Sequence, residues 1–362
     1  PVDVVAVLQS AIAGPDPAAR IAALAPNSPA YVALRYAYRR YQGAVQAGGW
    51  PSLPKAPQPA LLQRRLAAEG YLPQGYASNA YDSATVAAVR AFQKHHGLEP
   101  SGILSPATIA ELNVSAEQRV REISVNLERL RWLQRSIPAD RVWVNTALAQ
   151  LVAYRNDRPV FTTRVVVGAT DKQTPEFATE IASILFNPPW NVPLSIASRE
   201  ILPRLSEEPG YLSRHHMIMR RGGAIQQLAG PHSALGQLKF EMANRFDVYL
   251  HDTPLKALLS RSNRRLSHGC VRVENPRELA ALLLQEPVAT INKEVAMGYT
   301  HRRALPVPLP VFVVYQTAFA AADGSVEFRR DVYARDDEIW RGLTRTQQLP
   351  VADRTLAGQR KG

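Results

Sequence analysis

Cys270 is the only cysteine in the 362-residue chain, and it stands in the sequence SHGCVRV, residues 267–273. His251 precedes it in the sequence FDVYLHDT, residues 246–253. A thiol with its ordinary pKa of about 8.5 is mostly protonated at neutral pH, so it needs a base or a positive neighbour to become a nucleophile. The two residues therefore predict nucleophilic catalysis, with Cys270 as the nucleophile and His251 as its base.

The residues around His251 alternate in polarity, as in a half-buried strand. One face is apolar, and we expect it to join the core: Phe246, Val248 and Leu250. The opposite face carries Asp247, Tyr249 and His251. The phenol of Tyr249 either hydrogen-bonds substrate there or serves in packing. The His251 ring nitrogen that does not face sulfur needs an acceptor, and the backbone carbonyl of Asp252 is the nearest candidate.

Gly269 lacks a Cβ atom and therefore lets the backbone approach a substrate closely. We expect the amides around His268, Gly269 and Cys270 to hold a developing oxyanion. His268 is a second candidate for the base. It ranks below His251 because its own backbone amide is expected to hold the same oxyanion.

The candidate substrate-binding residues are Tyr249, Arg272, Ser267 and Trp190. By strand alternation Arg272 faces the same side as Cys270, where it either binds a substrate carboxylate or pairs with Glu274 or Asp252. Trp190 stands in NPPWNVP, and fixing a strand exit is its alternative role.

Two other interpretations of the cysteine are open. A single cysteine is often an inert, small apolar residue of the core, but the polar and glycine neighbours of Cys270 argue against an apolar niche. A zinc site formed by His251, His268 and Cys270 lacks an evident fourth ligand. We therefore expect no metal and no cofactor.

Charge and composition restrict the function class. The chain has 43 Lys and Arg against 31 Asp and Glu, a formal net charge of +12, which favours an anionic partner. Nucleic acid is one such partner, but no helix-turn-helix, zinc-finger or aromatic RNA-binding motif accompanies the charge. No apolar run reaches the roughly 20 residues needed to span a bilayer. The chain begins at Pro1, which suggests a cleaved leader.

The elements that must position these residues fall into successive regions. Apolar periodicity predicts helices over 1–50 and 115–135, and a Gly- and Pro-rich linker over 48–59. After Pro138 short β-branched runs predict strands, with a hairpin turn at Asp323-Gly324. The segment 193–230 is too long for an ordinary connection and predicts a flap.

Two stretches resemble known families. Residues 58–113 resemble the small three-helix peptidoglycan-binding module through these landmarks: Asp82 to Thr85, Phe92-Gln93, Gly97-Leu98 and Gly102 to Leu104. HDT followed by SHGCVRV resembles the catalytic signature of the L,D-transpeptidases, cysteine enzymes that remodel bacterial peptidoglycan. TPEF, NPPWNVP and GPHSALGQLKF fall in the order expected for the large periplasmic subclass, over residues 58–335.

The resemblance implies an α+β fold: a mostly-β L,D-transpeptidase catalytic domain with a helical scaffold and an inserted three-helix peptidoglycan-binding domain. The expected domain boundaries are 1–57 and 114–139 for the scaffold, 58–113 for the module, 140–345 for the catalytic domain with a capping insertion at 193–230, and 346–362 for a tail.

The resemblance also implies Cys270 as nucleophile, His251 as base and the Asp252 carbonyl as its orienting partner. The implied reaction joins third-position residues of peptidoglycan stem peptides through a cysteine thioester, with stem peptides as donor and acceptor and carbapenem β-lactams as covalent inhibitors. An L,D-carboxypeptidase, a lipoprotein-to-murein transferase and a non-catalytic murein-binding scaffold are the alternatives. The expected location is the periplasm, after export by a signal peptide absent from this chain, and the expected state is a monomer.

Overall fold

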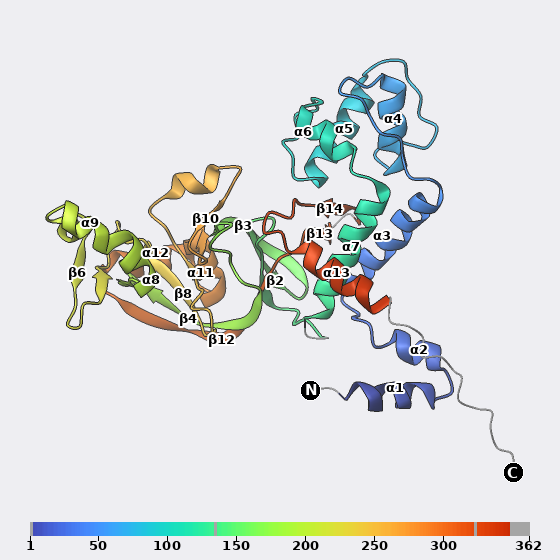
Figure 1. The fold of residues 1–362 in the computed structure, drawn as a ribbon. Coiled ribbons are helices and arrows are strands. Elements are labelled where there is room, and N and C mark those ends of the chain that lie inside the picture. Colours follow the sequence, from blue (N-terminus) through green and yellow to red (C-terminus); the bar gives the residue numbers. More distant parts are fainter. Residues whose placement is uncertain (1–2, 134–135, 322–323, 348–362) are drawn as a thin grey trace, which may run out of the picture. The chain divides into compact units, whose positions relative to one another are not determined.

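The computed structural model describes residues 3–133, 136–321 and 324–347 (Figure 1). The chain divides into two compact units: Pro1–Ile137 with Gln316–Gly362, and Pro138–Tyr315. The first unit is mainly helical and the second is built on a large sheet. The predicted α+β class is therefore confirmed.

The first unit contains the elements α1 (Val4–Ile12), α2 (Pro17–Ala22), α3 (Pro29–Gln46), α4 (Pro59–Ala68), α5 (Ser83–His95), α6 (Pro106–Leu112), α7 (Ala116–Arg131), β13 (Ala318–Ala320), β14 (Val326–Phe328) and α13 (Asp336–Gln347). Most of its helices begin at a short polar side chain that accepts a hydrogen bond from a backbone amide of the first turn, as at Asp82 and Ser105. Proline at the first turn of α6 fits because that amide has no helical partner.

The sheet unit ends earlier than the predicted catalytic boundary at residue 345. The described residues that follow Gln316 belong to the helical unit, where Ala318, Val326 and Phe328 share one core with Tyr31 and Leu34. The reason is that β13 and β14 form a short antiparallel hairpin whose apolar residues cover α3 and α7. The predicted turn residue Asp323 lies outside the described residues.

The small module has a core of its own, formed by apolar residues of α4, α5 and α6. Buried Gln93 organises the turn after α5, because its side chain accepts from the Gly102 amide and donates to the Ile103 carbonyl. Gly97 and Gly102 take positive φ values of 65° and 79°, which glycine adopts without strain. The landmark residues of this module therefore have structural roles.

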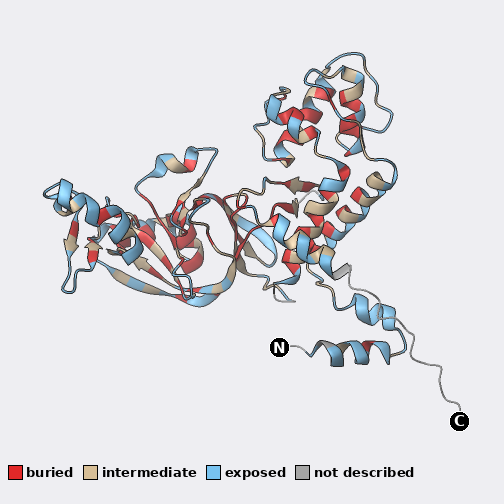
Figure 2. Ribbon diagram, viewed as in Figure 1, coloured by how far each residue is buried: buried red, intermediate tan, exposed pale blue. Residues whose placement is uncertain are grey.

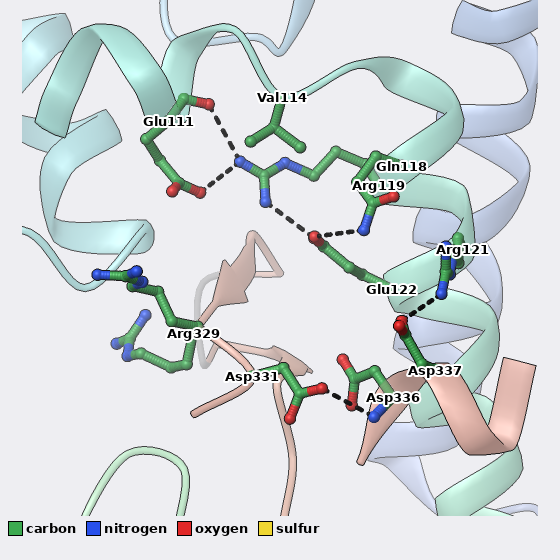
Figure 3. A pocket seen from close by; sticks show the side chains of 11 residues that line it. Glu111, Val114, Gln118, Arg119, Arg121, Glu122, Arg329, Asp331, Asp336 and Asp337 are labelled. Atoms are coloured by element: carbon green, nitrogen blue, oxygen red, sulfur yellow. Dashed lines mark hydrogen bonds and ion pairs between the residues drawn. The ribbon is translucent and has the colours of Figure 1, made fainter. Parts of the chain in front are cut away.

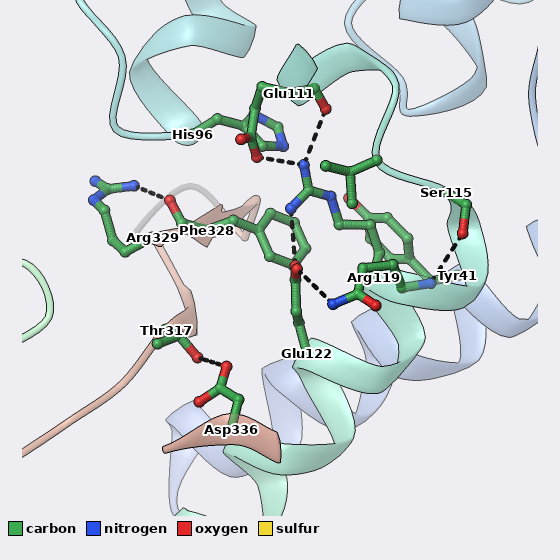
Figure 4. A network of polar contacts seen from close by, with 12 residues as sticks. Tyr41, His96, Glu111, Ser115, Arg119, Glu122, Thr317, Phe328, Arg329 and Asp336 are labelled. Atoms are coloured by element: carbon green, nitrogen blue, oxygen red, sulfur yellow. Dashed lines mark hydrogen bonds and ion pairs between the residues drawn. The ribbon is translucent and has the colours of Figure 1, made fainter. Parts of the chain in front are cut away.

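Arg119 on α7 ties the module to the rest of the helical unit (Figure 4). Its guanidinium donates to the Glu111 carboxylate of α6 at 2.5 Å and to Glu122 at 2.8 Å, and it lies 4.4 Å from the centre of the Phe328 ring. These ion pairs compensate the burial of the Arg119 charge.

The second unit contains a nine-stranded sheet formed by β1 (Arg141–Asn145), β2 (Gln150–Arg155), β3 (Arg158–Gly168), β4 (Phe177–Phe186), β8 (Leu238–Met242), β9 (Leu250–His251), β10 (Arg265–Ser267), β11 (Val271–Val273) and β12 (His301–Val314). The strand order is β10-β3-β11-β9-β8-β4-β12-β1-β2, and β2 also pairs with β3. Because of that pairing the sheet closes on itself as a barrel.

Helices α11 (Pro276–Leu284) and α12 (Val288–Ala296) add apolar residues to the barrel core, among them Leu279 and Ile291. Figure 2 shows buried residues concentrated along the strands and on α11. Pro276 is the first residue of α11, and the Asn275 side chain before it donates to Thr163 and does not cap the helix.

The predicted flap is an insertion of short helices and strands, with a small core of its own. It comprises β5 (Trp190–Asn191), α8 (Leu194–Ile196), a π-helical turn (Ala197–Ile201), α9 (Leu202–Glu207), α10 (Tyr211–Arg214), β6 (Met217–Met219) and β7 (Ile225–Gln227). Its three strands pair in the order β5-β7-β6. Ala197, Ile201, Tyr211, Met217 and Ile225 form its core.

Candidate active site

Strand pairing brings the two predicted catalytic residues to neighbouring strands. β9 and β11 pair in parallel, with Arg272 opposite His251 and Val271 opposite Leu250. The Val271 amide donates to the Tyr249 carbonyl at 3.1 Å. Cys270 directly precedes β11, and Tyr249 directly precedes β9. The two residues therefore lie opposite each other in the register of these strands.

The strand that carries His251 is shorter than predicted. β9 comprises Leu250 and His251 alone, while Phe246 lies in a turn and is 38% exposed. The prediction that Phe246 joins the core is wrong, because Asp247 takes a positive φ of 53° and the alternation begins only after it. Val248 and Leu250 are buried as predicted.

The Cys270 thiol is half-buried, and its Sγ donates to the Asp247 carbonyl at 3.8 Å. Burial raises the pKa of this thiol, against the opposing effects of Tyr249, Lys239 and Arg272. The described residues include no hydrogen bond between Cys270 and His251. The resting thiol is therefore protonated, and it must turn from Asp247 to reach a base.

His251 is 4% exposed and buried beside a cation. Burial and the Arg272 charge lower the pKa of His251 to about 3, while the backbone carbonyls of Asp252 and Leu235 act in the opposite direction. The ring is therefore neutral at neutral pH, and burial and the neighbouring cation both oppose its protonation. Nδ1 is buried without a hydrogen-bond partner among the described residues, so the Asp252 carbonyl faces the ring but is not bonded to Nδ1.

The Asp252 side chain has a structural role that the sequence does not indicate. Its carboxylate accepts from the Gln237 amide at 2.9 Å and from Lys256 Nζ at 2.6 Å. Gly236 is required beside it, since a Cβ there would come within 2.4 Å of the carboxyl group. The carboxylate thus fixes the loop that presents the Leu235 carbonyl to His251.

Tyr249 interacts with both predicted catalytic residues, His251 and Cys270. Its ring centre is 5.6 Å from that of His251, and Lys239 Nζ lies 4.2 Å from the ring centre. Burial and interactions with Cys270 raise the pKa of Tyr249, while the Trp190 side chain acts in the opposite direction. Trp190 from β5 of the insertion therefore faces the Tyr249 hydroxyl, a role beyond the strand exit that the sequence suggests.

The loop before Cys270 is held by two hydroxyl groups. Ser267 Oγ accepts from the Gly269 amide at 3.1 Å and donates to the Cys270 carbonyl at 2.6 Å. Thr174 Oγ1 donates to the Gly269 carbonyl at 2.8 Å and accepts from the Gly168 amide at 2.9 Å. Gly269 has a φ of 118°, a backbone conformation that residues with a Cβ atom rarely adopt.

Two predictions on this loop change. The Gly269 amide is occupied by Ser267, so it is not a free oxyanion donor. The amides of His268 and Cys270 have no acceptor among the described residues and remain candidates for that role. Ser267 is buried with its hydroxyl turned to the backbone, so it shapes the loop instead of contacting substrate.

Arg272 is a cation without an acidic partner in the described parts of the chain, and its Nε is buried and unbonded. The predicted alternative, an ion pair with Glu274 or Asp252, is wrong. Glu274 pairs with Arg164 and Asp252 pairs with Lys256. Burial lowers the pKa of Arg272. Its guanidinium is therefore a cation that no described carboxylate compensates.

The His268 ring is bound by the insertion and not by the sulfur, because its Nε2 lies 2.6 Å from Glu200 Oε1. Lys172 Nζ approaches the same oxygen at 3.0 Å. Sequence reasoning missed Glu200, Lys172, Lys239 and Thr174, which come from separate elements. TPEF, noted above as a landmark, contains Thr174, but its spacing alone does not reveal a contact with Gly269.

Among the residues that the structure describes, no group of three or more His, Cys, Asp or Glu side chains is arranged to hold a metal ion. A cavity of about 140 Å³ lies in the helical unit, lined by residues such as Glu111, Arg121, Asp336 and Asp337 (Figure 3). Several of its charges are already compensated, as in the ion pair of Arg121 with Asp337. It contains neither Cys270 nor His251 and is no candidate for the chemistry.

Comparison with known proteins matches two regions of the chain to known domain families. Residues 139–306 match the family described as L,D-transpeptidase catalytic domain, and residues 55–112 match the family described as "Putative peptidoglycan binding domain". One region of the chain thus matches L,D-transpeptidase catalytic domains and another matches peptidoglycan-binding domains, and the resemblance noted in the sequence is confirmed.

A Haemophilus influenzae protein named "Putative L,D-transpeptidase" is 31% identical over 244 residues, which cover 60% of this chain and 49% of that protein. The chain thus spans about half the length of this curated relative.

Solved structures give weaker matches. An L,D-transpeptidase from Xylanimonas cellulosilytica is 18% identical, with a TM-score of 0.28 and coverage of 73% of this chain and 97% of that one. The catalytic domain of the Enterococcus faecium L,D-transpeptidase acylated by ertapenem is 11% identical, with a TM-score of 0.26 and coverage of 49% and 99%. At such scores the assignment rests on the sequence matches.

Proposed function

We propose that this protein is a cysteine-dependent L,D-transpeptidase that joins the third-position residues of two peptidoglycan stem peptides. The observation that supports the proposal is the parallel pairing of β9 with β11, in which the strand that follows the only cysteine pairs with the strand of a neutral buried histidine, and Arg272 lies opposite that histidine. The proposed substrate has free carboxylates, which suit Arg272 and the net charge of +12.

In the first half-reaction His251 takes the thiol proton, and Cys270 Sγ attacks the carbonyl carbon of the third residue of the donor stem. A C–S bond forms and the carbonyl π electrons move to oxygen. The amides of His268 and Cys270 stabilise the oxyanion. On collapse, the bond to the fourth residue breaks, and His251 returns the proton to the departing D-alanine amine. A thioester remains on Cys270.

In the second half-reaction a side-chain amine of the acceptor stem attacks the thioester. His251 accepts the amine proton and returns it to sulfur as the C–S bond breaks. The new amide replaces the peptide bond lost in the first step, so no ATP is needed. The thiol must turn from the Asp247 carbonyl toward His251 before the first step.

The proposed role of residues 58–113 is to hold the enzyme on its polymer, and the proposed location is the bacterial cell envelope. No helix among the described residues is long and apolar enough to cross a membrane. The site residues carried into the proposal are Cys270, His251 and the Asp252 carbonyl, with Tyr249, Arg272 and Trp190 in contact with substrate.

The test is to incubate the purified chain with disaccharide-tetrapeptide and to follow the products by mass spectrometry. We expect D-alanine release and a cross-linked dimer, and neither product with Cys270→Ala. D-alanine release without dimer would identify a carboxypeptidase. Unchanged product formation by Cys270→Ala would refute the cysteine mechanism.

A second test uses a carbapenem, since the Enterococcus faecium relative is acylated by ertapenem. We expect one adduct of the mass of the inhibitor on the wild-type chain and none on Cys270→Ala. A chain without an adduct that still binds murein would support the non-catalytic scaffold.

A further inference from the structure

An ion-paired group outside the proposed chemistry connects the insertion to the loop before Cys270. Glu200 lies in the π-helical turn Ala197–Ile201, and its Oε1 accepts from His268 Nε2 at 2.6 Å and from Lys172 Nζ at 3.0 Å. His268 directly precedes Gly269. The Lys172 carbonyl would lie 3.9 Å from a Cβ placed on Gly269. The two residues that carry these donors therefore flank Gly269, which directly precedes the nucleophile.

The group is accessible to solvent. The side chains of His268, Lys172 and Glu200 are 35%, 36% and 43% exposed. Exposed ion pairs add little net stability, because water solvates the separated charges nearly as well. A competing carboxylate can therefore displace Glu200 at small cost, without disturbing a buried contact.

The insertion does not need Glu200 for its own folding. Its core is formed by Ala197 and Ile201 of the same turn with apolar residues of α10, β6 and β7. Burial raises the pKa of Glu200, but the hydrogen bonds from His268 and Lys172 outweigh this and lower it. The occupant of the site is therefore a carboxylate anion, held by two donors beside Gly269.

We propose that Lys172 and His268 form a subsite for a free carboxylate of the donor stem peptide, and that Glu200 occupies this subsite while it is empty of substrate. The inference rests on the proposed function and assigns part of its substrate recognition. Arg272 is the other candidate carboxylate partner, so the donor is held at two points around Cys270. Glu200 competes with substrate, and the insertion is released from this contact when substrate binds.

The subsite is tested by binding, in chains that carry Cys270→Ala so that no turnover occurs. The affinity for disaccharide-tetrapeptide is measured by calorimetry. Glu200→Gln removes the competing charge and is expected to lower Kd about threefold, a change within the range of exposed ion pairs. Lys172→Gln is expected to raise Kd about threefold or more. A donor with its third-residue side-chain carboxylate amidated shows whether that carboxylate is the one bound.

Glu208→Gln is the matched control. Glu208 belongs to the same insertion but pairs with Arg214 at 2.9 Å, within the insertion itself. Its substitution is expected to leave Kd unchanged. The same three substitutions with Cys270 intact should change KM for D-alanine release in the same directions.

An unchanged or raised Kd in Glu200→Gln, or an equal effect of Glu208→Gln, would overturn the inference. A weak effect of Lys172→Gln would do the same. Failure of the proposed function has a different signature, because wild-type chains would then release no D-alanine and accept no carbapenem. The changes in Kd would still support the carboxylate subsite in that case.

Discussion

Replacing Thr174 by valine tests how the loop before Cys270 is positioned. Thr174 is fully buried, and its hydroxyl joins the Gly168 amide to the Gly269 carbonyl. Valine has nearly the same shape but no hydroxyl, so both backbone groups lose this partner in the interior. A buried polar group left without a partner costs about 1–3 kcal/mol. We therefore expect Thr174→Val to lower the free energy of unfolding by about 2–4 kcal/mol.

The effect on acylation follows from the geometry. The Gly269 carbonyl belongs to the same peptide group as the Cys270 amide, one of the two candidate oxyanion donors. Without the hydrogen bond from Thr174, the peptide group between Gly269 and Cys270 can rotate. The Cys270 amide then no longer points toward the oxyanion. Removing one oxyanion donor costs about 10²–10³ in rate. We expect a loss of about tenfold to a hundredfold, since the amide is misaligned and not removed.

The assay is the single-turnover rate of carbapenem acylation by mass spectrometry, alongside thermal denaturation. Thr174→Ser is the matched control, because it keeps the hydroxyl and loses one methyl group, worth about 0.8 kcal/mol. It should acylate nearly as fast as wild type, although it is less stable. Equal acylation rates for Thr174→Val and wild type would refute the positioning role. Equal losses in the serine and valine variants would point to packing instead.

Three more predictions follow from the site. Because the pKa of His251 is lowered to about 3 in the folded chain, the unfolded chain binds a proton at a higher pH than the folded chain does. The contribution of His251 to the free energy of unfolding is full above about pH 6.5 and is lost as the pH falls toward 3. His251→Gln should reduce this dependence of the melting temperature on pH. Arg272→Met removes a buried cation without an acidic partner, so the melting temperature should hold or rise while KM for the tetrapeptide rises about tenfold; a large stability loss would contradict this account. Gly269→Ala places a Cβ in ordinary contact with the Gln173 and Lys172 carbonyls but forces a side chain onto a φ of 118°, so we expect a stability loss of about 1–3 kcal/mol and slower acylation, whereas an unchanged rate would show that the loop tolerates strain.

Local patterns predicted much of the fold. The caps at Asp82 and Ser105 mark the observed helix starts, because capping depends only on residues within one turn. The strand RVWVN is β1 in full, since alternation and β-branched content act locally. Local patterns do not locate the end of the sheet unit, because β13 and β14 look like any other strands in sequence. Their partners, α3 and α7, lie far away in the chain.

The sequence by itself determined the types of the reacting groups: one thiol, one histidine in a strand pattern, and a glycine beside the thiol. Only the tertiary structure decided their protonation and their partners. The pKa of His251 depends on burial and on Arg272 from β11, the Gly269 amide is taken by Ser267, and Glu200 reaches His268 from a distant insertion. These effects act through space over a few ångströms, and the distances follow from strand pairing and loop packing, which residue spacing along the chain does not fix.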